Sequence, residues 1–263
     1  MSEFDAKVQA NHLEIEESCM KDYEDLNEKE LRIQLAASYR LVAELGWDFL
    51  IFGHLTARVP GPDKHFLINP FGLMYDEVTA TNLVKIDLEG NIVEESKWPV
   101  NPAGFIIHSA VHSSKDFAHC VMHTHTNAGM AMASLKKGLI NIDFSGSAFH
   151  NKLAYHDFEG VTLREDECKR IADDMGNKSL MILKNHGLLT AGPTVAEAFM
   201  KLYMLESACQ VQLLARACDE EKEFVPENIA ERHANALKDA ADFKLAYRAL
   251  VRRMLRKDPS FIL

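Results

Sequence analysis

The chain has 263 residues, a formal charge of −10 and 47% hydrophobic residues. This length and hydrophobic content fit a globular domain with a sizeable core and exclude wholesale disorder. The acidic balance argues against nucleic acid as a partner, because phosphate binding needs clustered Lys and Arg. Five scattered cysteines without a CxxC pair indicate a cytoplasmic protein with reduced thiols. The sequence has no run of the roughly 20 apolar residues that a membrane helix needs, so no membrane partner is expected.

The first half of the chain begins with a polar, acidic stretch, residues 1–26, which predicts a loose N-terminal arm. A helix is then expected from Asn27, which forms a capping box with Glu30, to Gly46, a typical C-terminal stop. Between residues 51 and 93 the pattern changes to short strands. Asn101-Pro102 predicts the start of another helix, because proline favours the first helical position.

The second half alternates in the same way. Residues 119–125, HCVMHTH, are strand-like, and a helix through GMAMASLKK is expected to end at Gly138. Capping boxes at residues 162–165 and 194–197 predict helices that end near residues 175 and 218, on either side of the buried strand SLMILKN. The tail from Pro226 onward is helical again. This alternation predicts an α/β protein with helices packed on a central sheet.

Two histidines of the HCVMHTH segment carry the first chemical signal. Side chains two residues apart on a strand point to the same face, so His123 and His125 can direct both imidazoles at one point. Imidazole is a good ligand for zinc. The alternative is a polar strand face whose histidines meet water or a carbonyl group, since short motifs give many false positives.

A second signal favours the metal. The segment LMILKNHGLLTAG places His186 just beyond a buried strand, where α/β sheets put functional groups. Three histidines without a cysteine form the ligand set of a catalytic zinc site with an open position. The sequence therefore predicts one divalent ion on His123, His125 and His186, with zinc as the first choice and Mn, Fe, Co or Ni as alternatives.

The other histidines are less informative. His108 and His112 share a helix face at i, i+4, and we interpret them as packing or surface groups. His54 follows Gly53 in a loop at a strand edge and could line a cleft.

Five segments, in this order, resemble the class II aldolase/adducin-domain family, in its adducin-like branch that does not act on sugar phosphates. They are GWDFLIFGHLTARVPGP, FLINPFGLMYDEVTATNLVKID, NPAGFIIHSAVH, HCVMHTHTNAG and KNHGLLTAG with TVAEAF, and they cover roughly residues 28–218. The resemblance implies a three-layer αβα fold, a divalent metal on His123, His125 and His186, and often a homotetramer with sites between subunits. It divides the chain into an arm (1–26), the aldolase/adducin-like domain (27–220) and a C-terminal helical extension (221–263).

The departures from that family concern its proton-transfer and phosphate groups. Sugar-phosphate aldolases carry a general acid/base Glu four residues before the position of His108, where this chain has Gly104. Their reacting-group Tyr falls on Phe144. Their phosphate-binding Ser and Asn side chains fall on Pro102, Ala103, Phe71 and Gly53. The substrate-pocket candidates that remain are His54, Asn69, Gly72, Gly104 and Tyr155.

These departures shape the functional prediction. A metal on imidazoles polarises a carbonyl and stabilises an enolate. Retro-aldol cleavage also needs a base, whereas decarboxylation begins without one. We therefore expect a metal-dependent lyase, by C–C cleavage or decarboxylation, that acts on a small non-phosphorylated hydroxy- or keto-acid. A replacement acid could come from Tyr155, His156, Asp157 or Glu159 in the polar YHDFEG segment, which is otherwise a surface turn.

Two further functions stay open at the level of the sequence. One is a conventional class II aldolase or epimerase. The other is a non-catalytic adducin-like assembly domain, because a fold does not fix a function.

Overall fold

A mixed sheet forms the centre of the computed structural model, which describes residues 3–160, 165–240 and 242–263. Within these residues the strand order is β3-β2-β1-β4-β7-β6-β5, and all neighbours are antiparallel except β5 and β6. The strands are β1 (His54–Arg58), β2 (Phe66–Ile68), β3 (Val84–Ile86), β4 (Cys120–Thr124), β5 (Leu153–His156), β6 (Leu180–Leu183) and β7 (Gly187–Gly192).

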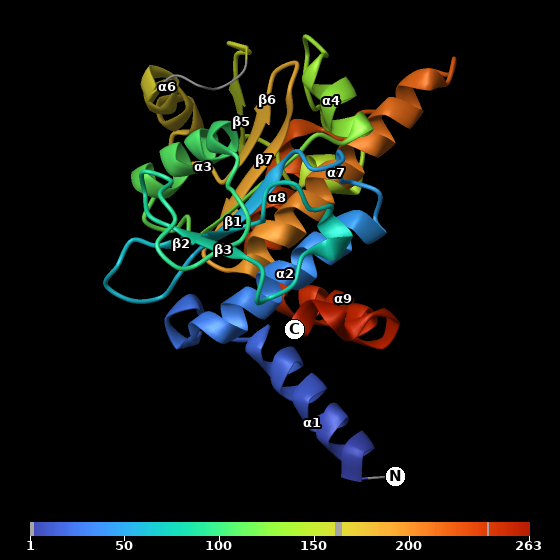
Figure 1. The fold of residues 1–263 in the computed structure, drawn as a ribbon. Helices are drawn as coiled ribbons and strands as arrows, with labels where there is room; N and C mark the ends of the chain where they lie inside the picture. Colours follow the sequence, from blue (N-terminus) through green and yellow to red (C-terminus); the bar gives the residue numbers. More distant parts are fainter. Residues whose placement is uncertain (1–2, 161–164, 241) are drawn as a thin grey trace.

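Helices cover both faces of this sheet (Figure 1). On one face α2 and α7 pack on the strands with α9 behind them, and on the other face lie α3 and α6. The predicted α/β fold with three layers is therefore confirmed. The helices are α1 (Glu3–Ser18), α2 (Glu28–Glu44), α3 (Pro102–Ser114), α4 (Asn127–Ala133), α5 (Phe144–Ser147), α6 (Glu165–Met175), α7 (Val195–Ala217), α8 (Glu227–Ala240) and α9 (Phe243–Lys257).

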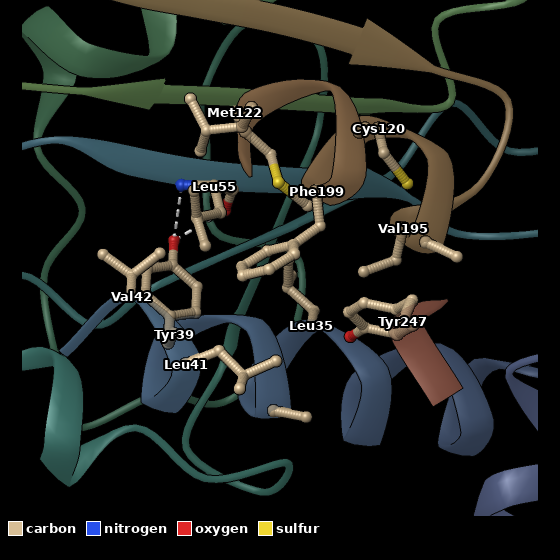
Figure 2. Packing of buried hydrophobic residues seen from close by; sticks show 14 of the residues in the cluster. Leu35, Tyr39, Leu41, Val42, Leu55, Cys120, Met122, Val195, Phe199 and Tyr247 are labelled. Carbon is tan, nitrogen blue, oxygen red and sulfur yellow. Dashed lines mark hydrogen bonds between the residues drawn. The ribbon is translucent and has the colours of Figure 1, made fainter. Parts of the chain in front are cut away.

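The larger core lies between the sheet and the α2–α7 layer, as Figure 2 shows. Leu55 of β1 and Met122 of β4 point into it, because alternate strand residues face the same side. Tyr39 of α2 fixes the position of β1: its hydroxyl accepts a hydrogen bond from Leu55 N (2.8 Å) and lies 2.6 Å from Leu55 O. The adjacent residue, His54, is thereby placed on the opposite face of the sheet.

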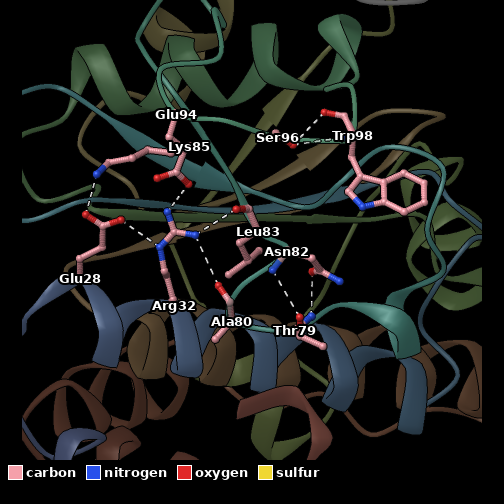
Figure 3. Close-up of polar contacts among 10 residues, drawn as sticks. All are labelled: Glu28, Arg32, Thr79, Ala80, Asn82, Leu83, Lys85, Glu94, Ser96 and Trp98. Atoms are coloured by element: carbon pink, nitrogen blue, oxygen red, sulfur yellow. Dashed lines mark hydrogen bonds and ion pairs between the residues drawn. The ribbon is translucent and has the colours of Figure 1, made fainter. Parts of the chain in front are cut away.

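Helix α2 begins as the sequence predicts. The Asn27 side chain accepts from Glu30 N (3.0 Å), and the Glu30 carboxylate accepts from Asn27 N (3.1 Å). Arg32 then connects the helix to the segment around β3 (Figure 3). It donates to the carbonyls of Ala80 and Leu83 and pairs with Glu94. These contacts fasten the edge of the sheet to the helix that supports its centre.

The N-terminal arm is not loose over residues 3–18, which form α1, and this part of the prediction is wrong. Figure 1 shows α1 projecting from the body, so only its last turns meet the protein. There Ile15 is buried, and Glu16 pairs with Arg248 (3.2 Å) and Arg252 (3.1 Å) of α9. A helix with so short a contact needs no continuous apolar face. The sequence of α1 therefore lacks the periodic apolar pattern that would have predicted a helix.

Two other helix boundaries were predicted, at Gly138 and at Thr162. Helix α4 ends at Ala133 and not at Gly138, because the Ser134 N–H already bonds back to Met130 and Ala131 and the chain turns. The capping residue expected at Thr162 lies outside the described residues, although the helix that it would begin, α6, ends at Met175 as predicted.

The C-terminal tail is helical, as expected, and it is part of the main core. Tyr247 and Val251 of α9 and Phe261 are fully buried there, and the Tyr247 hydroxyl donates to Gln34 O of α2 (2.7 Å). Across the described ranges, no helix combines the length and apolar character needed to cross a bilayer.

Candidate metal centre

Three histidines meet at one end of the sheet. His123 lies near the end of β4, His125 follows that strand, and His186 lies in the turn between β6 and β7. Strands β4 and β7 are antiparallel neighbours with His123 opposite Leu189, so the turn comes alongside β4. One ring nitrogen from each histidine lies within 4.8 Å of the other two. The structure thus brings together the three residues that the sequence selected.

The hydrogen bonds of His123 give its ring a defined tautomer. Its Nδ1 lies 2.8 Å from the Leu188 carbonyl oxygen, which can only accept, so Nδ1 carries the proton. The lone pair is then on Nε2, which lies 2.7 Å from Nε2 of His125. Histidines that bind metals are commonly oriented by such a bond from the second ring nitrogen to a carbonyl. The arrangement is therefore suited to metal ligation.

Electrostatics favour the same conclusion. Burial, together with the neighbouring imidazoles His125 and His186, holds the pKa of His123 well below its usual range. Burial likewise lowers the pKa of His125 and, with His125 and His156 nearby, lowers that of His186 to about 4. Neutral imidazole is the form that binds a metal ion, so the three side chains could hold a divalent cation such as Zn²⁺ at neutral pH.

The glycine after His186 is required by close packing. A Cβ atom on Gly187 would lie 2.3 Å from the Thr124 carbonyl oxygen and 3.2 Å from ring atoms of His123 and His125. The turn before it is tight, with Asn185 at φ +57, a conformation that asparagine tolerates better than most residues. The NHG sequence therefore sets how closely His186 approaches β4.

The position of His125 depends on a second cap. Thr126 accepts from Gly129 N (3.0 Å) at the start of α4 and donates to the buried carboxylate of Glu206 on α7 (2.5 Å). The chain leaves the sheet to make this cap, so β4 ends at Thr124 and His125 lies outside the strand. The expected strand, residues 119–125, was therefore one residue too long at each end. Glu206 was not anticipated because nothing in its helical pattern marks it.

Comparison with known proteins now identifies the family. A sequence model described as the class II aldolase and adducin N-terminal domain matches residues 33–213. The chain belongs to this family. A putative aldolase class 2 protein of Caulobacter vibrioides is 48% identical over 188 residues, which are 72% of this chain and 73% of that protein. α-Adducin of Rattus norvegicus is 44% identical over 192 residues, which are 72% of this chain and 26% of the adducin.

Solved structures agree with the family assignment. An aldolase II superfamily protein from Pseudomonas syringae has a TM-score of 0.86 at 41% identity, covering 91% of this chain and 97% of that one. A structure titled L-fuculose 1-phosphate aldolase, from Glaciozyma antarctica, has a TM-score of 0.78 at 33% identity and covers 88% and 92%. The class II aldolase fold is therefore established for this chain.

A close contact joins His54 of β1 to Gly104 of α3. A Cβ atom on Gly104, in the first turn of α3, would lie 1.6 Å from Nε2 of His54. His54 is buried and pairs in register with His123 across β1 and β4, so both side chains face the same layer. Burial, with His125 and His186 nearby, lowers the pKa of His54 to about 3. A neutral imidazole thus fills the place where any side chain at position 104 would begin.

The other two histidines of this layer form a directed chain with Thr56. His112 Nδ1 donates to Ala118 O (2.7 Å), so its Nε2 accepts from the Thr56 hydroxyl (2.7 Å). The Thr56 oxygen then accepts from His108 Nδ1 (2.6 Å), which leaves the lone pair of His108 on its buried Nε2. The packing interpretation of His108 and His112 is confirmed, and these bonds fix the ring of His108 5.6 Å from that of His54.

Two pocket candidates lie on the face of the sheet opposite the three histidines. Tyr155 of β5 points into the α7 layer, where its hydroxyl accepts from Leu139 N (3.0 Å). Asn69 follows β2 and turns toward α2, with its Oδ1 3.0 Å from the Tyr39 hydroxyl. Side-chain direction alternates along a strand, and the sequence indicates a surface turn at Tyr155, where the structure has β5. Neither side chain joins the histidines.

Gly72 and Phe144 have different surroundings. Gly72, with φ +109, follows Phe71, whose ring lies 6.4 Å from that of Phe52. Phe144 is 67% exposed, and its ring lies 4.5 Å from His233 of α8. The side chains of Pro102 and Ala103 lie outside what the structure describes.

The YHDFEG segment is mainly a surface turn with ion pairs. Asp157 pairs with Lys184 (2.6 Å), and Glu159 pairs with Arg170 (2.6 Å). His156 differs because it is buried, with Nδ1 2.7 Å from the Asp174 carboxylate.

Beside His156 lies an acidic group that the sequence reading did not select. His156 Nε2 is 3.8 Å from Oε1 of Glu167, a buried residue of α6. Both residues line a cavity of about 10 Å³ with His186. Glu167 was not predicted as a site residue, because the many charged residues around it indicate a helix that faces solvent.

The rim of the centre is aromatic. The ring of Phe49 lies 5.8 Å from His125, and that of Phe158 lies 6.1 Å from His186. Both phenylalanines are about half exposed, at 46% and 54%. The approach to the three histidines is therefore largely apolar.

Proposed function

We propose that this chain is a metal-dependent lyase that breaks a C–C bond next to a carbonyl group in a small non-phosphorylated hydroxy- or keto-acid, with decarboxylation as the favoured reaction. The observation that carries the proposal is the pairing of His54 with Gly104 beside His123, His125 and His186. It combines a metal-ligand set with a site that has no room for a carboxylate side chain at position 104.

A divalent ion on these histidines would supply a Lewis acid for a carbonyl or carboxylate oxygen of the substrate. Aldol cleavage needs, in addition, a base that removes a hydroxyl proton, a contribution of about 10²–10⁴-fold. Position 104 offers no base, and the low pKa of His54, about 3, makes its imidazole a weak one. Loss of CO₂ begins without proton removal. The proton that must later reach carbon can come from solvent or from the His156–Glu167 pair beside His186.

The rim argues for a substrate without phosphate. A phosphate dianion needs several charge-assisted hydrogen bonds, each worth about 1.5–3 kcal/mol. Phe49 and Phe158 offer none, and Lys184 at the same end of the sheet is paired with Asp157.

Two observations favour other functions. The L-fuculose 1-phosphate aldolase structure at 33% identity favours a conventional aldolase, in which His156 and Glu167 would have to supply the base. Identity to α-adducin favours an assembly domain, although the match covers only 26% of the adducin. Three neutral imidazoles directed at one point are a feature that an assembly role does not require. Both functions therefore rank below the lyase.

The test joins metal content to turnover. Protein purified without chelator should contain close to one divalent ion per chain and release CO₂ from a member of a panel of hydroxy- and keto-acids. Removal of the ion, or His123→Ala, should abolish both. His233→Ala, which changes a histidine remote from the centre, should leave both unchanged.

Two results would change the assignment. Efficient cleavage of L-fuculose 1-phosphate by the wild type would establish a conventional aldolase. Full metal loading without turnover of any acid or sugar phosphate would support the assembly domain. A His123→Ala variant with normal metal content would overturn the metal centre itself.

A further inference from the structure

A second cavity lies at the other end of β6 from His186. It has a volume of about 1030 Å³, at the upper limit of ordinary ligand pockets. Its wall includes the turn that leads into Leu180, the first residue of β6, whereas His186 follows the last. The wall is completed by the segment after α5, one side of α7, and parts of α8 and α9. This cavity is therefore separate from the candidate metal centre.

Cationic side chains gather in this wall although the chain as a whole carries a charge of −10. Four lysines line the cavity together with two carboxylates. One of these carboxylates, Asp242, is engaged in capping α9 through Leu245 N (2.9 Å). The lysines are Lys152, Lys178, Lys201 and Lys244. The local charge is thus opposite to that of the whole protein.

Two of the lysines are bound only to backbone carbonyls within the described ranges. Lys178 donates to Leu153 O (2.8 Å), and Lys201 donates to Ala191 O (3.1 Å). Each ammonium group has three N–H donors, so each retains bonding capacity. Burial lowers the pKa of Lys201, and only the nearby Glu197 opposes this effect. Glu197 offsets this desolvation only in part, so an anionic ligand in the cavity would stabilise the charged form of Lys201.

Apolar side chains make up much of the rest of the wall, beside the polar Asn151, Asn177 and Ser179. The large apolar residues are Phe149, Leu180, Met204, Leu237 and Phe243. Such a surface suits a molecule with a hydrophobic body and one charged end, because its apolar area would leave water as its anion meets the ammonium groups.

We propose that this cavity binds a small amphipathic organic anion, with its phosphate or carboxylate head group on Lys178 and Lys201 and its apolar part on Phe149, Leu237 and Phe243. The site does not depend on the metal or on the reaction at the three histidines. It gives the protein a second small-molecule site at the far end of the same strand.

The probe for this site is 1-anilinonaphthalene-8-sulfonate, an anion with apolar rings whose fluorescence rises on leaving water. It should bind saturably to the intact protein, with close to one site per chain. Decyl phosphate and decanoate share one apolar body, so their competition with the probe distinguishes the two head groups. Displacement by either one supports the site, and the stronger competitor identifies its preferred anion.

Variants at the lysines decide whether the cavity is the binding site. Lys201→Met and Lys178→Met keep the length of the side chain and remove its charge, and each should weaken binding about tenfold through loss of a charge-assisted hydrogen bond. Lys169→Met alters an exposed lysine of α6 outside the cavity and should bind the probe as the wild type does. Metal content should be the same in all four proteins.

Two outcomes would overturn the proposal. One is a probe signal that neither decyl phosphate nor decanoate displaces. The other is unchanged affinity in both lysine variants. If Lys201→Met fails to fold, as judged by circular dichroism, the half-buried Lys178→Met still tests the same head-group contact.

Discussion

His54 and Gly104 share one small volume at the metal end of the sheet, although they are far apart in the sequence. The imidazole can occupy it only because residue 104 has no Cβ, which would lie 1.6 Å from Nε2. Introducing a carboxylate by Gly104→Glu alone would therefore displace His54. Any such change has to be combined with a smaller residue at position 54.

This contact predicts strong coupling between the two positions. Gly104→Ala should destabilise the wild type by about 1–3 kcal/mol, the usual cost of overpacking. In a His54→Ala background the same change should be neutral or stabilising, because alanine favours a helix over glycine by up to about 1 kcal/mol. Urea unfolding of the four proteins measures the coupling energy.

A second glycine provides the control for this cycle. Gly129 of α4 is also crowded, since its Cβ would lie 2.6 Å from the Thr126 hydroxyl, but it does not meet His54. The cost of Gly129→Ala should be the same with either residue at position 54. Equal costs for Gly104→Ala in the two backgrounds would contradict the shared volume.

The same residues show how far the sequence could predict the site. His123, His125 and His186 were found from strand spacing and from a strand end, which are local patterns. The contact of His54 with Gly104 joins β1 to α3, and a local pattern contains no information about it. Tyr155 was misplaced because the polar YHDFEG segment indicates a surface turn, whereas Tyr155 lies on β5 with its side chain toward α7.

At the level of elements, the β6–β7 hairpin determines where His186 lies. Its turn approaches β4 so closely that the Thr124 carbonyl leaves no room for a side chain at Gly187. Gly187→Ala should therefore push the turn away from His123 and His125 and lower metal affinity about 10–100-fold, as changes in groups that orient ligands commonly do. Competition with a chromogenic chelator measures the affinity.

The other end of β7 supplies a matched control. A Cβ on Gly192 would lie 2.8 Å from Ala198 N, a similar crowding far from the histidines. Gly192→Ala should lower stability and leave metal affinity unchanged. If the two variants lose metal equally, the effect is a general loss of structure and not a change in the turn.

Element boundaries were predictable where a side chain defines them. Asn27 and Thr194 cap α2 and α7 as their sequences indicate. Helix α1 was not predicted, because its contact with α9 involves few residues and its composition is that of a solvated segment. The C-terminal helices were predicted as helices, but their burial in the main core depends on packing against α2, which the sequence of the tail alone does not reveal.

At the scale of the whole molecule, assembly stays a prediction. The homotetramer implied by the family resemblance is compatible with the exposed aromatic side chains at the rim of the metal centre. Phe49, Phe52 and Phe158 are 46%, 42% and 54% exposed, and such surfaces often become buried between subunits.

The stability of the molecule should depend steeply on pH, because the sheet buries several neutral histidines. Burial lowers the pKa of His54 and His112 to about 3 and that of His186 to about 4, and holds those of His108 and His123 well below their usual range. In the unfolded chain each would titrate near 6.5.

The sign of the pH effect follows from these differences. Above about pH 6.5 these imidazoles are neutral in both the folded and the unfolded chain, so the free energy of unfolding has its full value there. Below it the unfolded chain binds protons that the folded chain does not, so each group lowers the free energy of unfolding by about 1.4 kcal/mol per pH unit.

We expect urea midpoints, measured with chelator present to remove competition from metal, to fall sharply between pH 6.5 and 5. His112→Gln removes one of these groups, so the free energy of unfolding of this variant should fall less steeply with decreasing pH, by about 1.4 kcal/mol per pH unit. A midpoint that stays constant over this range would contradict the lowered pKa values of these buried imidazoles.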